Sequence, residues 1–260
     1  MHHSQGCRHS QGDLPVSSVH ITAELIEMGA MLGVLLLSGL IFRKSVRPGW
    51  FLASIGAIIV GLGAWARGYG WIHEPAVFDQ LSYPWFDYVL LGAVSIAIIL
   101  AMPDGWRRSG MTLRHTGPGV PWALGLSLAL CGFLTYTAVA DVFGSPEFEL
   151  EPVAFNAFAS VPVEELFFRG VIVALMLEAF GARRTLLRAE MNWGLIPAAV
   201  VFGFGHLTSV SGGEEIVINY FQTLWTVFGG FVLVWLRVAT GSLLLPFAVH
   251  LYGNLIHFFI

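Results

Sequence analysis

The sequence predicts an all-α fold, a polytopic membrane helix bundle of about eight transmembrane helices. Hydrophobic residues make up 56% of the chain and charged residues only 12%, about half the share that soluble domains carry. The apolar residues gather into continuous runs, each long enough, or nearly so, to cross about 30 Å of bilayer as a helix. These runs do not show the dyad alternation that a transmembrane β-barrel needs.

Eight such runs follow one another along the chain. They cover residues 23–42, 50–66, 85–102, 121–140, 155–180, 193–209, 217–236 and 242–260. The second and the sixth are the shortest. Since no soluble domain separates them, residues 21–260 are expected to form a single integral-membrane domain. Residues 1–20 are polar and lack the basic start and apolar core of a signal peptide, so they are expected to be a disordered tail.

The loops between the runs alternate in charge. Positive residues follow every second run, at Arg43, Lys44, Arg47, Arg107, Arg108, Arg114, Arg183, Arg184, Arg188 and Arg237. The intervening loops are rich in acids, with Arg67 as an exception. This alternation follows the positive-inside rule and predicts a multi-pass protein of the cell membrane with both termini outside. The net charge is −4, and no basic patch indicates a nucleic acid as partner.

Two acids and a base interrupt the fifth run, at Glu164, Glu165 and Arg169. A charged side chain at the centre of a membrane helix costs roughly 2.5–3.5 kcal/mol, so ionisable residues at this depth are candidates for function. Glu165 and Arg169 are four residues apart, which places them on one helical face as a pair. Glu164 points about 100° away. The three residues form either a structural salt-bridge cluster or a site in which Glu164 is left for chemistry.

Two later runs place histidines at membrane depth. Phe202 and His206 are four residues apart near the end of the sixth run, as are His250 and Asn254 in the last run. Each pair is therefore expected on a single helical face. A lone membrane histidine usually makes a hydrogen bond between helices. Two histidines, an asparagine and a charged cluster on three separate runs instead predict one shared cavity.

The chemistry that these groups favour is hydrolysis. A carboxylate in an apolar site is a better base at neutral pH, and a histidine beside it can hold a water molecule. A second histidine and an amide can donate hydrogen bonds to a developing oxyanion. Because no serine or cysteine stands with these groups in a nucleophile-elbow context, water is the expected nucleophile.

Three motifs occur in order on separate runs: Glu-Glu-x-x-x-Arg from Glu164, Phe-x-x-x-His up to His206, and His-x-x-x-Asn from His250. Together they resemble the CPBP family of CAAX proteases and bacteriocin-processing enzymes, which includes the Ras-converting prenyl-protein protease. The resemblance covers residues 164–254 and implies a catalytic core in 150–260.

The resemblance also implies a role for each residue of the motifs. Glu164 would activate the water, which His206 would help to bind. His250 and Asn254 would stabilise the oxyanion, while Glu165 and Arg169 would support the site. The implied activity is that of an intramembrane glutamate endopeptidase without cofactor or metal, acting on a membrane-associated peptide or protein in the lipid bilayer.

Prenyl-protein proteases work on the cytosolic face of the membrane. The charge alternation instead places Glu164 and His206 nearer the outer leaflet, because the fifth run passes from outside to inside and the sixth returns. The expected sidedness and the resemblance are therefore in tension.

Two alternatives accompany this interpretation. A zinc protease would use His206, His250 and Glu164 as ligands with water in the fourth position. The usual zinc-protease helix, His-Glu-x-x-His, is not found in the sequence, which counts against zinc. A non-catalytic immunity or scaffold protein of the same fold would use the polar cluster to bind a partner.

Overall fold

The computed structural model describes residues 18–67, 71–142, 144, 146–181 and 183–260. Residues 1–17 of the expected tail lie outside the described residues. The tail prediction extends three residues too far, because Ser18, Val19 and His20 already form the first turn of a helix.

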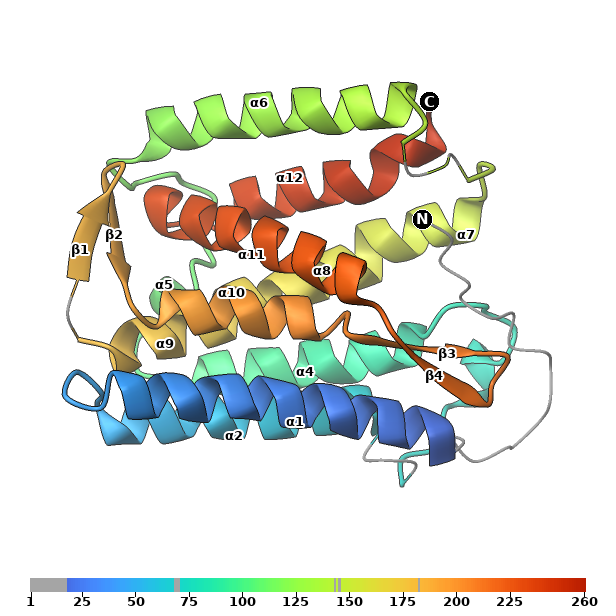
Figure 1. The fold of residues 1–260 in the computed structure, drawn as a ribbon, viewed down its shortest axis with the longest axis horizontal. Helices are drawn as coiled ribbons and strands as arrows, with labels where there is room; N and C mark the ends of the chain where they lie inside the picture. The colour runs from blue at the N-terminus through green and yellow to red at the C-terminus, as the bar shows by residue number, and fades with distance from the viewer. Residues whose placement is uncertain (1–17, 68–70, 143, 145, 182) are drawn as a thin grey trace.

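Helices dominate the structure and run roughly parallel to one another (Figure 1). The longer ones are α1 (Ser18–Ile41), α2 (Pro48–Trp65), α4 (Trp85–Ala101), α6 (Val120–Val139), α10 (Leu195–Phe204), α11 (Tyr220–Thr240) and α12 (Leu244–Leu255). Short helical turns are η1 (Ala76–Phe78), α5 (Gly105–Arg108) and η4 (Ile256–Phe258).

One further helix is continuous but composite. It consists of α7 (Leu150–Phe155), the π-helical turn η2 (Asn156–Ser160), α8 (Val161–Glu164), the π-helical segment η3 (Glu165–Ile172) and α9 (Val173–Ala179). Pro162 has no backbone N–H, so one ordinary helical hydrogen bond is lost next to the first π turn. Such π turns inside α-helices occur frequently at functional sites.

The all-α membrane fold predicted from the sequence is confirmed. Among the described residues, α1, α2, α6 and α11 are long and apolar enough to cross a membrane. Three shorter apolar helices begin at Trp85, Leu195 and Leu244. Together with the composite helix, these elements overlap the eight predicted runs. The number of helices that cross the bilayer stays a prediction.

Two antiparallel β-hairpins were not predicted. The first joins β1 (Arg183–Leu186) to β2 (Ala189–Asn192), and the second joins β3 (Thr208–Ser211) to β4 (Glu215–Ile218). The second hairpin removes the end of the sixth predicted run from its helix. Its strands are rich in β-branched residues, which favour a pleated backbone. Gly212 and Gly213 in its turn have φ angles of +60° and +78°, where glycine carries no steric cost.

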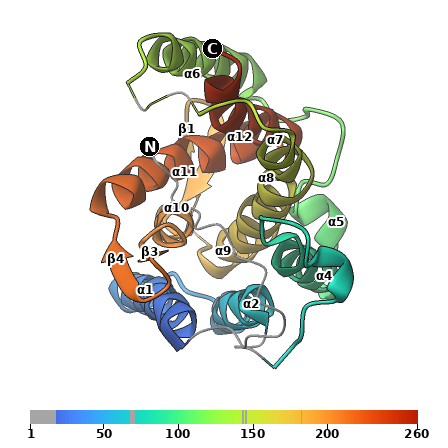
Figure 2. The same ribbon diagram turned by 90° about the vertical axis from the view of Figure 1, so that its right-hand side faces the viewer.

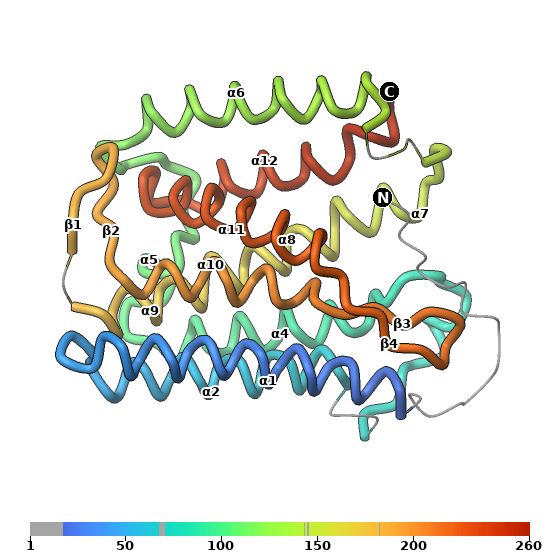
Figure 3. The backbone as a smooth tube through the Cα atoms, in the orientation of Figure 1, coloured from blue at the N-terminus to red at the C-terminus, as the bar shows by residue number. Residues whose placement is uncertain are grey.

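The two ends of the bundle differ in the segments that they carry. The α1–α2 connection, α5, the β1–β2 hairpin and the last turn of α11 lie at one end, on the left of Figures 1 and 3. These segments hold most of the basic residues of the alternating pattern. The β3–β4 hairpin and the α6–α7 connection lie at the other end (Figure 3). We call the first the basic end.

The main hydrophobic core lies around the composite helix. Viewed end-on, α9 and α10 are inside the bundle, with α1, α2, α4 and α11 around them (Figure 2). Phe167, Val171 and Ile172 are fully buried there. The outward faces carry exposed apolar side chains such as Leu128 and Leu224. Lipid rather than water is the solvent that suits those faces.

The contact between α10 and α11 depends on Gly203. A Cβ atom at this position would lie 2.8 Å from the backbone nitrogen of Val227 and 3.0 Å from the carbonyl oxygen of Thr223. The two backbones can approach this closely only because the side chain is missing.

We expect Gly203→Ala to lower the free energy of unfolding by about 1–3 kcal/mol, the usual cost of overpacking. Thermal unfolding of the purified protein in detergent measures the effect. Gly229→Ala is the matched control, since a Cβ there meets nothing within 4 Å. Equal losses of stability in the two variants would contradict this account of the helix contact.

Candidate active site

Glu164 is buried near the centre of the composite helix. Its Oε1 accepts two hydrogen bonds of 2.9 Å, one from Tyr88 Oη of α4 and one from Ser160 Oγ of its own helix. Both donors are hydroxyl groups on a single carboxylate oxygen. They fix the orientation of the carboxylate and leave Oε2 turned toward a third group, His250.

His250 of α12 lies between the two carboxylates. Its Nδ1 is 2.8 Å from Glu165 Oε1, and its Nε2 is 3.9 Å from Glu164 Oε2. The first contact is a hydrogen bond in which Nδ1–H donates, because an ionised carboxylate only accepts. The second is too long for a direct hydrogen bond. Nε2 and Oε2 therefore face the same small space.

Arg169 forms the expected ion pair with Glu165, with 3.1 Å between Nη1 and Oε1. The guanidinium is fully buried, and its carbon lies 3.7 Å from the centre of the Phe202 ring. Among the described residues, no acceptor makes a well-directed hydrogen bond to its nitrogens. Charge attraction and the cation–π contact therefore hold Arg169 in place.

His206 does not lie on a helix, contrary to the sequence interpretation. α10 ends at Phe204, so His206 comes two residues beyond the helix end and just before β3. Its Nδ1 is 3.3 Å from the carbonyl oxygen of Phe202, and the two rings are 5.3 Å apart. The Phe202 ring also lies 5.7 Å from the His250 ring. Phe202 is thus the residue that connects Arg169, His206 and His250.

Asn254 lies on the same face of α12 as His250, one turn later, as expected. Its Nδ2 donates to Asn156 Oδ1 at 2.9 Å, and Asn156 Nδ2 donates to the carbonyl oxygen of Pro152 at 2.8 Å. The amide of Asn254 is therefore attached to the composite helix, two helical turns before Glu164.

The six candidate residues thus fall into two groups. Glu164, Glu165, Arg169 and His250 make direct contacts or face one another across 3.9 Å. His206 is linked to them through Phe202, and Asn254 is linked through Asn156 to the helix that carries Glu164.

Sequence reasoning missed three residues of this site. Asn156 and Ser160 precede Glu164 at intervals of four residues, a polar stripe on an apolar helix that could have been recognised. Tyr88 comes from a distant helix, and nothing in the sequence around it indicates a partner.

The positions of Glu164 and His206 along their helices bear on the tension over sidedness. The composite helix begins at Leu150 rather than residue 155, so Glu164 lies 14 residues from its start and 15 from its end, at Ala179. α10 has only ten residues, about 15 Å or half of the hydrocarbon thickness, before His206. Glu164 is thus central in its helix, and His206 follows a helix of only ten residues. The side of the membrane to which the site opens stays a prediction.

The β3–β4 hairpin beside His206 is attached to the first helix. Glu27 of α1 accepts hydrogen bonds from the backbone nitrogen and the hydroxyl of Thr208, at 2.8 and 2.9 Å. Irregular backbone at membrane depth is tolerated where protein satisfies its polar groups. Glu27 satisfies two donors at the point where the chain leaves the site.

A metal ion would need several convergent ligands. Within the described part of the chain, no group of three or more histidine, cysteine, aspartate or glutamate side chains is arranged to hold one. A catalytic zinc needs three protein ligands around a single point. The zinc alternative does not fit this arrangement.

Comparison with known proteins adds one finding. Residues 146–256 match the family model described as type II CAAX prenyl endopeptidase Rce1-like. The matched segment contains all six candidate residues, whereas Tyr88 and Glu27 precede it. No curated protein and no solved structure matches the chain. The family resemblance seen in the motifs is confirmed.

We expect Arg169→Ala to destabilise the protein strongly. Removing one partner of a buried ion pair strands the other charge and costs about 3–5 kcal/mol. Thermal unfolding and the yield of folded protein in detergent measure this loss. Arg107→Ala is the control, because the Arg107 side chain is 82% exposed. An unfolding midpoint of Arg169→Ala equal to that of the parent would refute the role given to this pair.

Proposed function

We propose, from the match of residues 146–256 to the Rce1-like family of CAAX proteases, that the protein is an intramembrane endopeptidase. In this proposal a water molecule activated by Glu164 hydrolyses a peptide bond. The substrate is a membrane-associated peptide or protein, and the family description favours a prenylated one. The enzyme works in the cell membrane, with its basic end toward the cytosol.

The observation that carries the proposal is the position of the Glu164 carboxylate. Oε1 is engaged by Tyr88 and Ser160, so Oε2 is the oxygen that can act as base. It faces His250 Nε2 across 3.9 Å. A water molecule beside this gap can form hydrogen bonds to both atoms. Such a water would already be in contact with its base.

The proposed reaction keeps the protons balanced. Glu164 takes a proton from the water while the water oxygen attacks the scissile carbonyl carbon, and an oxyanion forms. The protonated Glu164 then gives its proton to the amide nitrogen as the C–N bond breaks. The products are a carboxylic acid and an amine, which become a carboxylate and an ammonium ion by proton transfer at neutral pH, and Glu164 is restored as a base.

Stabilisation of the oxyanion requires N–H donors near the reacting carbonyl. Asn254 has two amide hydrogens, of which Asn156 uses one, so the second can donate to an oxyanion. His250 presents Nε2 on the side of Glu164, and this nitrogen can donate to the oxyanion once it also carries a proton. Its ring is held by the Nδ1 contact with Glu165, whose charge Arg169 balances. Glu165 and Arg169 are thus positioning residues in this scheme.

Glu164→Gln is the test of the proposed base. The amide is close in shape to the carboxylate but cannot take the proton, so we expect activity on a prenylated peptide to fall at least 100-fold, the low end of a general base's contribution. The unfolding midpoint should stay near that of the parent. Glu149→Gln, an exposed position just before the composite helix, is the matched control. A folded Glu164→Gln protein with parental activity would exclude Glu164 as the base, and an inactive parent would favour the scaffold alternative.

Tyr88→Phe tests whether the hydroxyl contact positions Glu164. A hydrogen bond to a charged group contributes about 1.5–3 kcal/mol, so kcat should fall roughly 10- to 100-fold. KM should change little, because the substrate does not touch the hydroxyl in this scheme. Tyr136→Phe, with a 67% exposed side chain, is the control. A large increase in KM with unchanged kcat would instead place Tyr88 in the substrate site.

Chelation separates the glutamate mechanism from the zinc alternative. If Glu164 activates the water directly, activity should survive prolonged treatment with a strong chelator, followed by buffer exchange. A zinc enzyme would lose activity and regain it on addition of Zn²⁺, because the ion acidifies its bound water. Stoichiometric zinc in the purified protein, with activity following its removal and return, would overturn the metal-independent proposal.

A further inference from the structure

We propose that the basic end of the bundle carries a binding site for the phosphate group of an anionic phospholipid. The site is a pocket of about 270 Å³ between the β1–β2 hairpin, α9 and the last turns of α11. Arg183, Arg188, Glu190 and Arg237 supply its charges, and Leu177 and Val238 contribute apolar surface. Three cations and one anion leave a charge of +2 around the pocket.

Arg237 is the fixed part of this site. It is 5% exposed, and its guanidinium donates from Nε to the carbonyl oxygen of Ser109 at 3.2 Å and from Nη2 to that of Arg108 at 2.7 Å. These bonds use two of five N–H donors. Carbonyl groups orient the guanidinium but do not neutralise its charge. The side chain also lies against Gly110, where a Cβ would collide with it.

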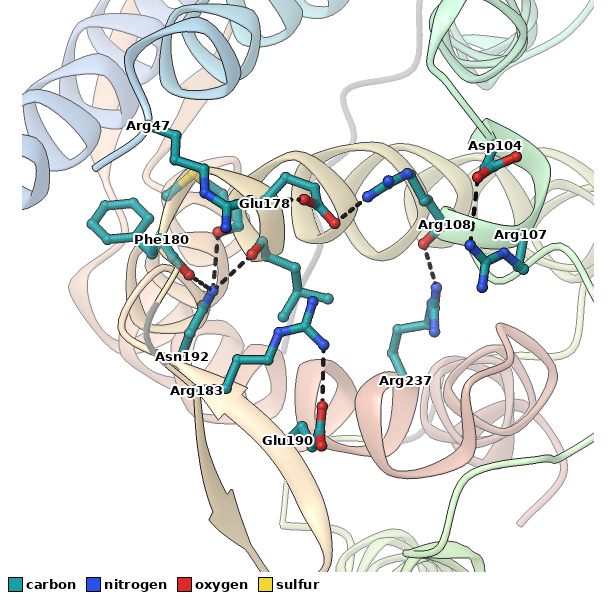
Figure 4. Close-up of polar contacts among 12 residues, drawn as sticks. Arg47, Asp104, Arg107, Arg108, Glu178, Phe180, Arg183, Glu190, Asn192 and Arg237 are labelled. Atoms are coloured by element: carbon teal, nitrogen blue, oxygen red, sulfur yellow. Dashed lines mark hydrogen bonds and ion pairs between the residues drawn. The ribbon is translucent and has the colours of Figure 1, made fainter. Parts of the chain in front are cut away.

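The neighbouring arginines are already matched with acids. Glu178 of α9 pairs with Arg108 and, at 3.4 Å, with Arg47, while Asp104 pairs with Arg107 (Figure 4). Arg183 Nη1 lies 3.1 Å from Glu190 Oε2 across the hairpin. Among the described residues, no acid forms a salt bridge with Arg188 or Arg237. Arg188 and Arg237 therefore bring unneutralised positive charge to the pocket, whereas Arg184 of the same hairpin lies over the Trp193 ring.

Arg188 of the pocket lies in the strained turn of the β1–β2 hairpin. Leu187 and Arg188 form the two-residue turn of the β1–β2 hairpin with φ angles of +47° and +65°. Asn-Gly is the sequence that this type of turn prefers, because other side chains are strained at positive φ. Strain of this kind collects at ligand clamps. Trp235 Nε1 donates to the carbonyl oxygen of Leu186 at 3.3 Å and attaches the hairpin to α11.

The same turn favours a lipid over free phosphate as the source of the anion. Leu186 and Leu187 are 55% and 49% exposed and stand next to the arginines. Apolar side chains beside basic ones are typical of segments that lie in the membrane interface. The positive-inside rule places this end at the cytosolic leaflet, where anionic lipids are enriched. Arginine suits the phosphate because its planar group can bind two oxygens at once.

The pocket is separate from the candidate active site. Leu177 in its wall lies 13 residues after Glu164 on the composite helix, about 20 Å along the axis. A lipid bound there does not occupy the space between Glu164 and His250. The inference therefore stands independently of the proposed protease activity.

Binding of short-chain phosphatidylglycerol to the full-length protein in an uncharged detergent tests the proposal. Calorimetric titration should show saturable binding of this lipid, and much weaker binding of phosphatidylcholine with the same chains. Arg188→Gln should weaken phosphatidylglycerol binding about fivefold, the equivalent of about 1 kcal/mol for one basic side chain near anionic lipid. Arg188→Lys should lose less than Arg188→Gln.

Arg43→Gln is the control, an exposed basic residue at the same end but outside the pocket. Its affinity should equal that of the parent. Equal binding of the two lipids, or equal losses in Arg188→Gln and Arg43→Gln, would overturn the site. If inorganic phosphate binds in an Arg188-dependent manner and phosphatidylglycerol does not, the pocket takes a soluble phosphate and the lipid assignment is wrong.

Discussion

The buried contact of Glu165 with Arg169 holds together the elements that build the site. Both side chains are buried at the centre of the bundle, where an unpaired charge costs several kcal/mol. Glu165 also accepts the hydrogen bond from His250, which attaches α12 to the composite helix. Arg169 lies on Phe202, which brings the end of α10 to the same place. Three helices thus converge on one compensated pair of charges.

The two adjacent acids, Glu164 and Glu165, have different contacts. Glu165 is bound to a cation and to an imidazole, so its charge is used for structure. Glu164, its neighbour in the chain, has neutral hydroxyl donors on one oxygen and the imidazole across a gap from the other. The groups that contact Glu164 Oε1 are neutral, whereas Glu165 contacts the Arg169 cation directly. This difference supports the proposal that Glu164 rather than Glu165 acts as the base.

The sequence alone allowed prediction of the parts of the fold that depend on burial in lipid. The apolar runs predicted helices because every backbone polar group in a bilayer must be satisfied internally. The Glu165–Arg169 pair and the shared face of His250 and Asn254 followed from helical spacing. The place of His206 did not, because the chain turns there into a hairpin at the end of the bundle, and that hairpin bonds to Glu27, a distant residue. Tyr88 was missed for the same reason, since its contact joins residues 76 positions apart.

The reliance of Glu164 on Tyr88 has a consequence for how this protein can be divided. The family motifs all lie in the second part of the chain, yet α4 donates a hydroxyl to the central carboxylate and α1 secures the hairpin beside His206. A fragment that kept every motif residue would still lack both contacts. The candidate site is therefore larger than the region recognised by its motifs. A chimera with another N-terminal part would need a phenol in place of Tyr88 and a carboxylate in place of Glu27 to keep these contacts.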